Sequence, residues 1–160
     1  MTKEDKELLL QDLCARLPYG VICKTSKGNG YLCSINQTIF GIEYGINIKA
    51  TERDYFNDKE EIIKPYLRPM SSMTAEELYE VQEILGKEAE IRDGFIHIID
   101  SSINSFTYLE LQAVFEWFNT YHFDYRGLIE KGLAIEAKEG MYDFKLLDYC
   151  LPSQNESDSF

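Results

Sequence analysis

Basic residues, cysteines, histidines and long apolar runs are all scarce in this sequence of 160 residues. No apolar stretch approaches the roughly 18 residues that a membrane-spanning helix needs. The four cysteines are too few for a disulfide scaffold, and the ten glycines follow no collagen period. Because 44% of the residues are hydrophobic and evenly spread, the chain is not intrinsically disordered. These absences leave a globular protein of one domain as the expectation.

The chain is short of positive charge. It carries 16 basic against 28 acidic residues, a formal net charge of -12, and no two Lys or Arg residues are adjacent. Direct binding to a nucleic-acid backbone or to an anionic membrane is therefore disfavoured, whereas a basic protein partner is favoured. The N-terminal residues lack the features of a signal peptide, so we expect a cytoplasmic protein with reduced thiols.

The first third of the sequence predicts one helix followed by a β-meander. Thr2 can cap a helix over residues 3–16, with an apolar face formed by Leu10, Leu13, Cys14 and Leu17. Alternating apolar residues over 20–50 indicate about three strands, with a bulge or turn near Ile39. Residues 51–61 read as charged and irregular. The two prolines in 62–69 exclude a central strand, and we expect an edge strand or loop there.

The register of the first hairpin decides where two cysteines lie. If residues 27–29 form the loop, Cys23 lies opposite Cys33, whereas a two-residue turn at Asn29 and Gly30 places them on opposite faces. The apolar pattern favours the first register, because Val21 then meets Ile35. Neither register completes a zinc site, so we interpret both cysteines as small core residues.

Two capping boxes and an Asp-Gly turn organise the second half. The boxes begin at Thr74 and Thr107, and Gly86 is a C-cap for the first of these helices. A hairpin turning at Asp93-Gly94 would pair Ala89 with Ile98 and Ile91 with Ile96. Asp124 can cap a short helix through Lys131, ended by Gly132. Residues 1–150 thus predict a single α+β domain with a mostly antiparallel sheet of about five strands, an N-terminal helix and two main later helices. Residues 151–160 predict a disordered tail.

The helix over about 107–122 has an unusually wide apolar arc. Its aromatic and aliphatic residues cover about half of the circumference, which exceeds what a surface helix requires. The helix is therefore either the central core helix or one that carries a partner on an edge of the arc. The residues of the arc are Tyr108, Leu111, Val114, Phe115, Trp117, Phe118 and Tyr121.

Candidates for catalysis are weak. His97, His122, Asp100 and Asp124 could meet in three dimensions, but core packing, capping and turn formation explain each of them. No metalloprotease, P-loop or serine-hydrolase motif is present, and we expect no metal and no cofactor.

Candidates for binding are Trp117, at the edge of the apolar arc, and the stripe of Glu76, Glu80 and Glu83. A solvated helix face is the simpler interpretation of the stripe. The alternative is mimicry of a phosphate backbone, because the charges recur roughly every 5 Å against 3.4 Å along one DNA strand.

Three segments carry a resemblance. LCARLPYG (13–20), KPYLRPMSSM (64–73) and HFDYRGLIEKGLA (122–134) resemble small uncharacterised proteins encoded in Bacteroides genomes and their phages. The resemblance covers residues 8 to about 142 and implies only a setting, the bacterial cytoplasm, under host or phage control.

Together these observations predict a non-enzymatic interaction or regulatory protein with a protein partner, a second copy of itself included. Two alternatives stay open. One is an acidic inhibitor of a nucleic-acid-binding protein, and the other is a small hydrolase or transferase with a site near His97 and His122.

Overall fold

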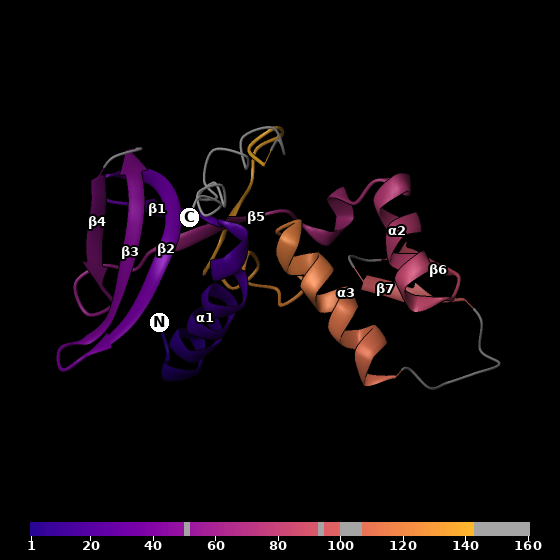
Figure 1. Ribbon diagram of the computed structural model, residues 1–160, viewed down its shortest axis with the longest axis horizontal. Helices are drawn as coiled ribbons and strands as arrows, with labels where there is room; N and C mark the ends of the chain where they lie inside the picture. Colours follow the sequence, from indigo (N-terminus) through magenta and orange to yellow (C-terminus); the bar gives the residue numbers. More distant parts are fainter. Residues whose placement is uncertain (50–51, 93–94, 100–106, 143–160) are drawn as a thin grey trace, which may run out of the picture.

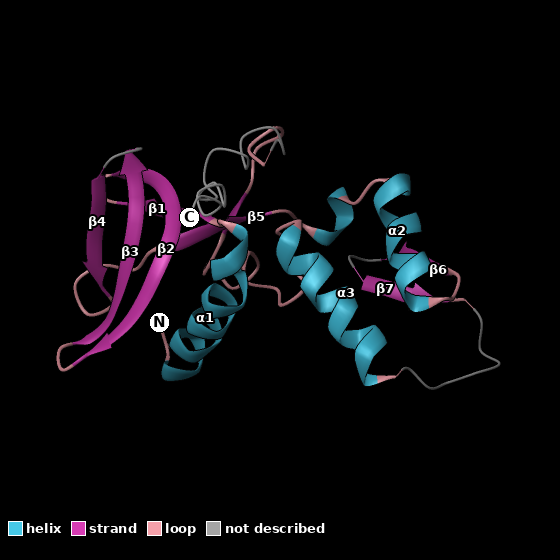
Figure 2. Cartoon of the chain, viewed as in Figure 1, coloured by secondary structure: helices cyan, strands magenta, loops and turns pink. Residues whose placement is uncertain are grey.

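The computed structural model describes residues 1–49, 52–92, 95–99 and 107–142. Within these residues the chain forms three α-helices, two short 3₁₀ helices (Leu17–Tyr19 and Met70–Ser72) and eight strands (Figures 1 and 2). The helices are α1 (Lys3–Arg16), α2 (Ala75–Leu85) and α3 (Tyr108–Thr120). The strands are β1 (Ile22–Thr25), β2 (Gly28–Thr38), β3 (Gly41–Lys49), β4 (Glu52–Asn57), β5 (Lys64–Leu67), β6 (Ala89–Arg92), β7 (Phe95–Ile98) and β8 (Ile135–Glu136).

The fold is the predicted single α+β domain, and in the described residues its main sheet has six strands in the order β4-β3-β2-β1-β5-β8. Every neighbouring pair is antiparallel except β5 with β8. Strands β1 to β4 pair in the order in which they follow one another, so this part of the sheet is a meander that is local in sequence, whereas β5 and β8 join it from farther along the chain. The turn expected near Ile39 is present, between Thr38 and Gly41.

Two of the strand predictions were wrong. Residues 52–57, expected to be irregular, form β4, because pairing with β3 buries Phe56 against the sheet core. Strand β5 is not at an edge, since it lies between β1 and β8. Its Pro65 is tolerated because only two residue pairs join β5 to β1 and two join it to β8.

Neither predicted register of the first hairpin is correct. Cys23 pairs with Gly30, and the turn lies at Ser26 and Lys27. The Thr25 hydroxyl closes this tighter turn by donating to the Gly28 carbonyl at 2.7 Å. The close approach of β2 to β3 requires glycine at position 30, because a Cβ there would lie 2.5 Å from the Asn47 carbonyl oxygen. Cys23 is buried, as expected, whereas Cys33 is half-buried at a bulge in β2.

Helix α1 has the predicted bounds but turns a different face inward. Thr2 and Asp5 form its capping box. The buried residues are Leu9, Asp12, Leu13 and Arg16, whereas Cys14 is exposed. The apolar spacing alone misplaced this face because a charged pair occupies two of its inward positions.

The later elements form a second, smaller hydrophobic core, at the right of Figure 1. Helices α2 and α3 have the predicted capping boxes, and the hairpin of β6 and β7 has the predicted register. The turn at Asp93-Gly94 lies outside the described residues. The first core joins α1 to the six-stranded sheet, and the second is built from Met70, Val81, Leu85, Val114, Phe118 and Phe123.

The short helix expected after Asp124 does not form, and residues 124–132 are a series of turns. The Asp124 carboxylate accepts hydrogen bonds from the backbone N–H groups of Leu128 and Ile129, both at 2.8 Å. Gly132 then takes a left-handed conformation, with φ of 68°. This segment returns the chain from the second core to the first, where Leu128 and Leu133 are buried.

Candidate functional site

A buried arginine on α1 joins the two cores. Arg16 donates to the Asp12 carboxylate from Nε at 2.8 Å and from Nη2 at 3.0 Å. Its remaining donors reach the carbonyl oxygens of Phe123, at 2.7 Å, and Phe118, at 3.3 Å. Both charged side chains are fully buried. With four of its five N–H donors used, the guanidinium fixes α1 against the end of α3, so the pair is structural and not a free ionic site.

A second arginine connects β5 to α2. Arg68 donates to both oxygens of Glu77, at 2.6 and 2.9 Å, and its guanidinium lies 4.2 Å from the centre of the Phe123 ring. Its backbone bonds to His122 and Asp124. Burial acts to raise the pKa of Glu77, but hydrogen bonds from Arg68 and Thr74 outweigh it, and the net pKa is lowered.

His122 is buried between the two cores and is only 1% exposed. Its backbone has a φ of +59°, and its ring stacks on Tyr142 with centroids 3.9 Å apart. Neither ring nitrogen has a hydrogen-bond partner among the described residues. Burial, with smaller effects from Arg16 and Arg68, lowers the pKa of the imidazole to about 3, and a marginal contact with the Tyr19 backbone opposes this weakly. The ring is therefore neutral at pH 7.

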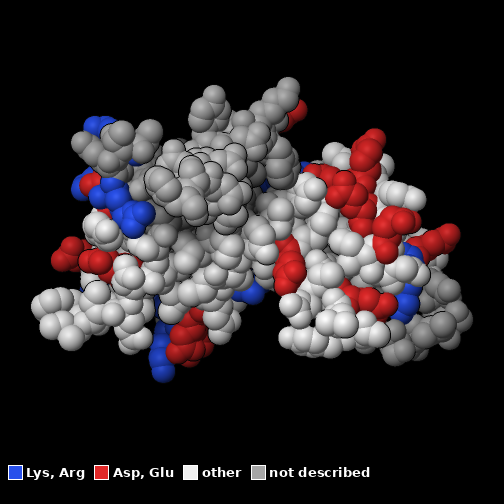
Figure 3. Space-filling model, viewed as in Figure 1, with Lys and Arg blue, Asp and Glu red and all other residues white. Residues whose placement is uncertain are grey.

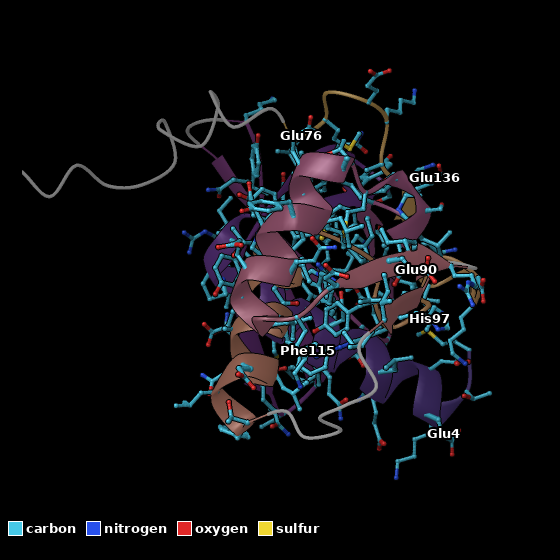
Figure 4. The ribbon with its side chains drawn as sticks, turned by 90° about the vertical axis from the view of Figure 1, so that its right-hand side faces the viewer. Glu4, Glu76, Glu90, His97, Phe115 and Glu136 are labelled. Atoms are coloured by element: carbon cyan, nitrogen blue, oxygen red, sulfur yellow. The ribbon has the colours of Figure 1, made fainter. Side chains whose placement is uncertain are left out.

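The structure does not bring the four catalytic candidates together as a set. His97, expected to face a core, is exposed on β7 opposite Glu90, whereas His122 is buried (Figure 4). Asp124 has both carboxylate oxygens occupied by backbone donors, and Asp100 lies outside the described residues. Within the part of the chain that the structure describes, no three His, Cys, Asp or Glu side chains are grouped to hold a metal ion.

Trp117 is half-buried in an aromatic cluster rather than projecting from it. Its ring stacks with the rings of Tyr121 and Phe123, at centroid distances of 4.3 and 5.6 Å. Its indole N–H donates to Glu80 at 3.0 Å, and the Tyr121 hydroxyl donates to the same carboxylate oxygen at 3.3 Å. Glu80 therefore has a packing role that the sequence did not reveal, in addition to its place in the acidic stripe.

Negative charge is concentrated on one part of the molecule, which we call the acidic lobe (residues 70–124). In the sequence this range has eleven acidic and two basic residues, a net charge of -9, and nine of the acidic and both basic residues are in the part of the chain that the structure describes. Residues 1–69 have ten of each and are neutral. Glu76, Glu80 and Glu83 are all exposed on α2. Figure 3 shows the carboxylates gathered over the lobe that carries α2, and Figure 4 places Glu76 at one end of that helix.

The same lobe exposes apolar side chains. Of the wide arc on α3, Val114 and Phe118 are buried, but Tyr108, Leu111 and Phe115 are exposed. The arc is thus wider than the second core covers. The sequence indicated this excess of apolar surface, but the described tertiary contacts were needed to show which residues it leaves uncovered.

Comparison of the chain with protein-family models, with curated proteins and with solved structures gives no match. Among the described residues, each helix is too short or too polar to cross a bilayer.

The sequence analysis also missed the buried Asp12–Arg16 pair. The available signal was an acid and a base four residues apart within an apolar helix face.

Proposed function

We propose that this chain is a non-enzymatic interaction or regulatory protein of the bacterial cytoplasm, and that its acidic lobe binds a basic surface of a partner protein. The observation that carries the proposal is the segregation of charge: residues 70–124 supply nine of the twelve net negative charges. A field of one sign on one lobe attracts and orients a partner of opposite sign. The exposed apolar residues of α3 on the same lobe supply the desolvated contacts that charge alone does not.

The inhibitor alternative is a special case of the same interaction. Glu76, Glu80 and Glu83 lie within eight residues of α2. The seven helical rises between the first and the last amount to about 10 Å, which matches about three phosphate spacings of one DNA strand. If the partner's basic surface is its nucleic-acid site, duplex DNA and this chain will compete for it. We make this competition an outcome of the test. The hydrolase or transferase alternative has less support, because His122 is buried and His97 lies on an exposed strand.

The proposal is tested by comparing three tagged forms of the full chain in its native host. The first is the wild type, and the second carries Glu76→Gln, Glu80→Gln and Glu83→Gln. Glutamine keeps a carbonyl acceptor for Trp117, so the aromatic cluster is retained. The matched control removes the same charge from the neutral part of the chain. It carries Glu4→Gln, Glu7→Gln and Glu60→Gln, and all three positions are exposed.

We expect nuclease-treated wild type and control to recover the same stoichiometric partner, and the α2 triple variant to recover at least tenfold less. Purified partner should then bind with an affinity that falls steeply with salt. Loss of the partner on adding duplex DNA would establish the inhibitor version. Equal recovery by all three forms would refute the proposal that the acidic lobe is the binding surface.

A further inference from the structure

The uncovered part of α3 has the geometry of a docking surface. Tyr108, Leu111 and Phe115, which we call the apolar stripe, are spaced i, i+3 and i+7 and so lie on one side of the helix. Their exposed fractions are 79%, 39% and 45%. Isolated exposed apolar residues are ordinary, but three in line on one helix form a continuous contact surface.

The stripe leads into a groove between the two cores. The Phe115 ring lies 5.2 Å from the Tyr125 ring, and Tyr125 lines a groove of about 320 Å³. Figure 4 shows Phe115 on α3 in the view that faces the acidic lobe. We call this hollow the interlobe groove, and its apolar walls come from Met70, Ile96, Phe118, Tyr125 and Ile129.

The charged residues that line the groove are of one sign. Two carboxylates and no lysine or arginine stand among its lining residues. Asp124 is held by backbone donors, but Glu130 is exposed, and Glu116 is exposed beside Phe115 on α3. Two arginines lie over the Tyr125 ring, Arg126 at 5.0 Å and Arg16 at 5.6 Å, and both are near the buried Asp12, at 3.9 and 2.8 Å.

We propose that the apolar stripe and the interlobe groove together bind a basic amphipathic segment of the partner protein. The segment's apolar side chains lie along the stripe and enter the groove, and its Lys and Arg side chains face Glu116 and Glu130. The charge complementarity argues for this occupant, because docking would remove the exposed Glu116 and Glu130 from part of their water, and only a basic segment supplies a counter-charge in return. The inference rests on the proposed function, of which it names the contact surface and the chemistry of the bound segment.

The test uses a synthetic 14-residue peptide of leucine and lysine, with leucine at helical i, i+3, i+4 and i+7 positions. Its control has the same composition in an order that destroys the apolar face. Binding to the full chain is measured by isothermal titration calorimetry. We expect the amphipathic peptide to bind at least tenfold more tightly than the control peptide, because only it presents one apolar face to the stripe.

Two variants locate the binding surface. Leu111→Ser with Phe115→Ser should weaken the amphipathic peptide at least tenfold. Ile39→Ser with Phe40→Ser should leave its affinity unchanged, because these residues are 91% and 68% exposed at the distant tip of the hairpin joining β2 and β3. Circular dichroism and chemical denaturation identify any variant that does not fold. Tyr108→Ser, at the most exposed position of the stripe, then provides a second variant, with at least threefold weakening expected.

Three results would overturn the inference. The first is equal affinity of the chain for the two peptides, and the second is an unchanged peptide affinity in the folded stripe variants. The third is a dimer of the free chain that the stripe substitutions dissociate, because the surface would then bind a second copy of the chain. The native partner separates this inference from the proposed function. If the α2 glutamine substitutions abolish recovery of the partner but the stripe variants recover it normally, the proposed function is supported and the inference is refuted. If the glutamine substitutions leave recovery of the partner unchanged, the proposed function itself is refuted.

Discussion

Acidification should destabilise this protein through one buried histidine. In the folded chain the pKa of His122 is about 3, mainly because of burial, whereas an unfolded histidine titrates near 6.5. The folded-state pKa is depressed, so the neutral ring contributes its full stability above about pH 6.5, and this is lost progressively as pH falls toward 3. The difference between these two pKa values corresponds to about 5 kcal/mol in total, of which roughly half is lost by pH 4.5.

The assay is urea denaturation at several pH values between 7 and 4.5, monitored by the fluorescence of Trp117, the single tryptophan. The share of the wild-type free energy of unfolding that His122 contributes should fall by about 1.4 kcal/mol per pH unit below about pH 6, because unfolding lets this ring take up one proton. His122→Asn should lose most of this slope, since asparagine is neutral and tolerates the positive φ of position 122.

A matched control is His97→Gln, which removes the exposed histidine of β7 and should keep the wild-type slope. Carboxylates whose pKa is lowered by folding, such as Glu77, also lose stability in acid, but they contribute equally in wild type and variants. The difference between wild type and His122→Asn therefore isolates the buried ring. A flat wild-type profile between pH 6.5 and 4.5, or the same slope in His122→Asn, would refute the argument from burial.

Further substitutions test the contacts that join and fill the two cores. Arg16→Ala removes both hydrogen bonds to the buried Asp12 carboxylate, to which only Arg126, at 3.9 Å, then remains close among the described cations. It should cost about 3–5 kcal/mol of unfolding free energy. Lys3→Ala breaks an exposed pair of the same i, i+4 spacing and should cost under about 0.5 kcal/mol. Similar losses in urea denaturation would contradict the structural role of Arg16. Trp117→Ala removes a ring that stacks with two others and should lower the free energy of unfolding by about 3 kcal/mol, measured as a fall in the thermal midpoint. An unchanged midpoint would mean that the ring is not part of the second core. Gly30→Ala should cost about 2 kcal/mol by the same measurement, because its methyl group meets the backbone of β3, and a neutral result would show that the strands can separate there.

The elements that the sequence determined are those set by local chemistry. Capping boxes at Thr2, Thr74 and Thr107 mark the starts of three helices, because each satisfies backbone donors within a single turn. The register of the hairpin formed by β6 and β7 followed from the alternation of its apolar residues on either side of one short turn. The composition also indicated that the protein carries strong negative charge.

Contacts between distant segments decided the rest. The first hairpin took a register that the strand pattern did not favour, because a threonine hydroxyl closes the turn and β2 approaches β3 closely at Gly30. The inward face of α1 includes a charged pair because carbonyl groups more than 100 residues away along the chain accept hydrogen bonds from Arg16. Likewise, the sequence determined the width of the apolar arc on α3, whereas only the packing of the second core decided which part is covered and which is left for a partner. Helical periodicity reports how much apolar surface a helix has, but burial depends on the shape and extent of what packs against it.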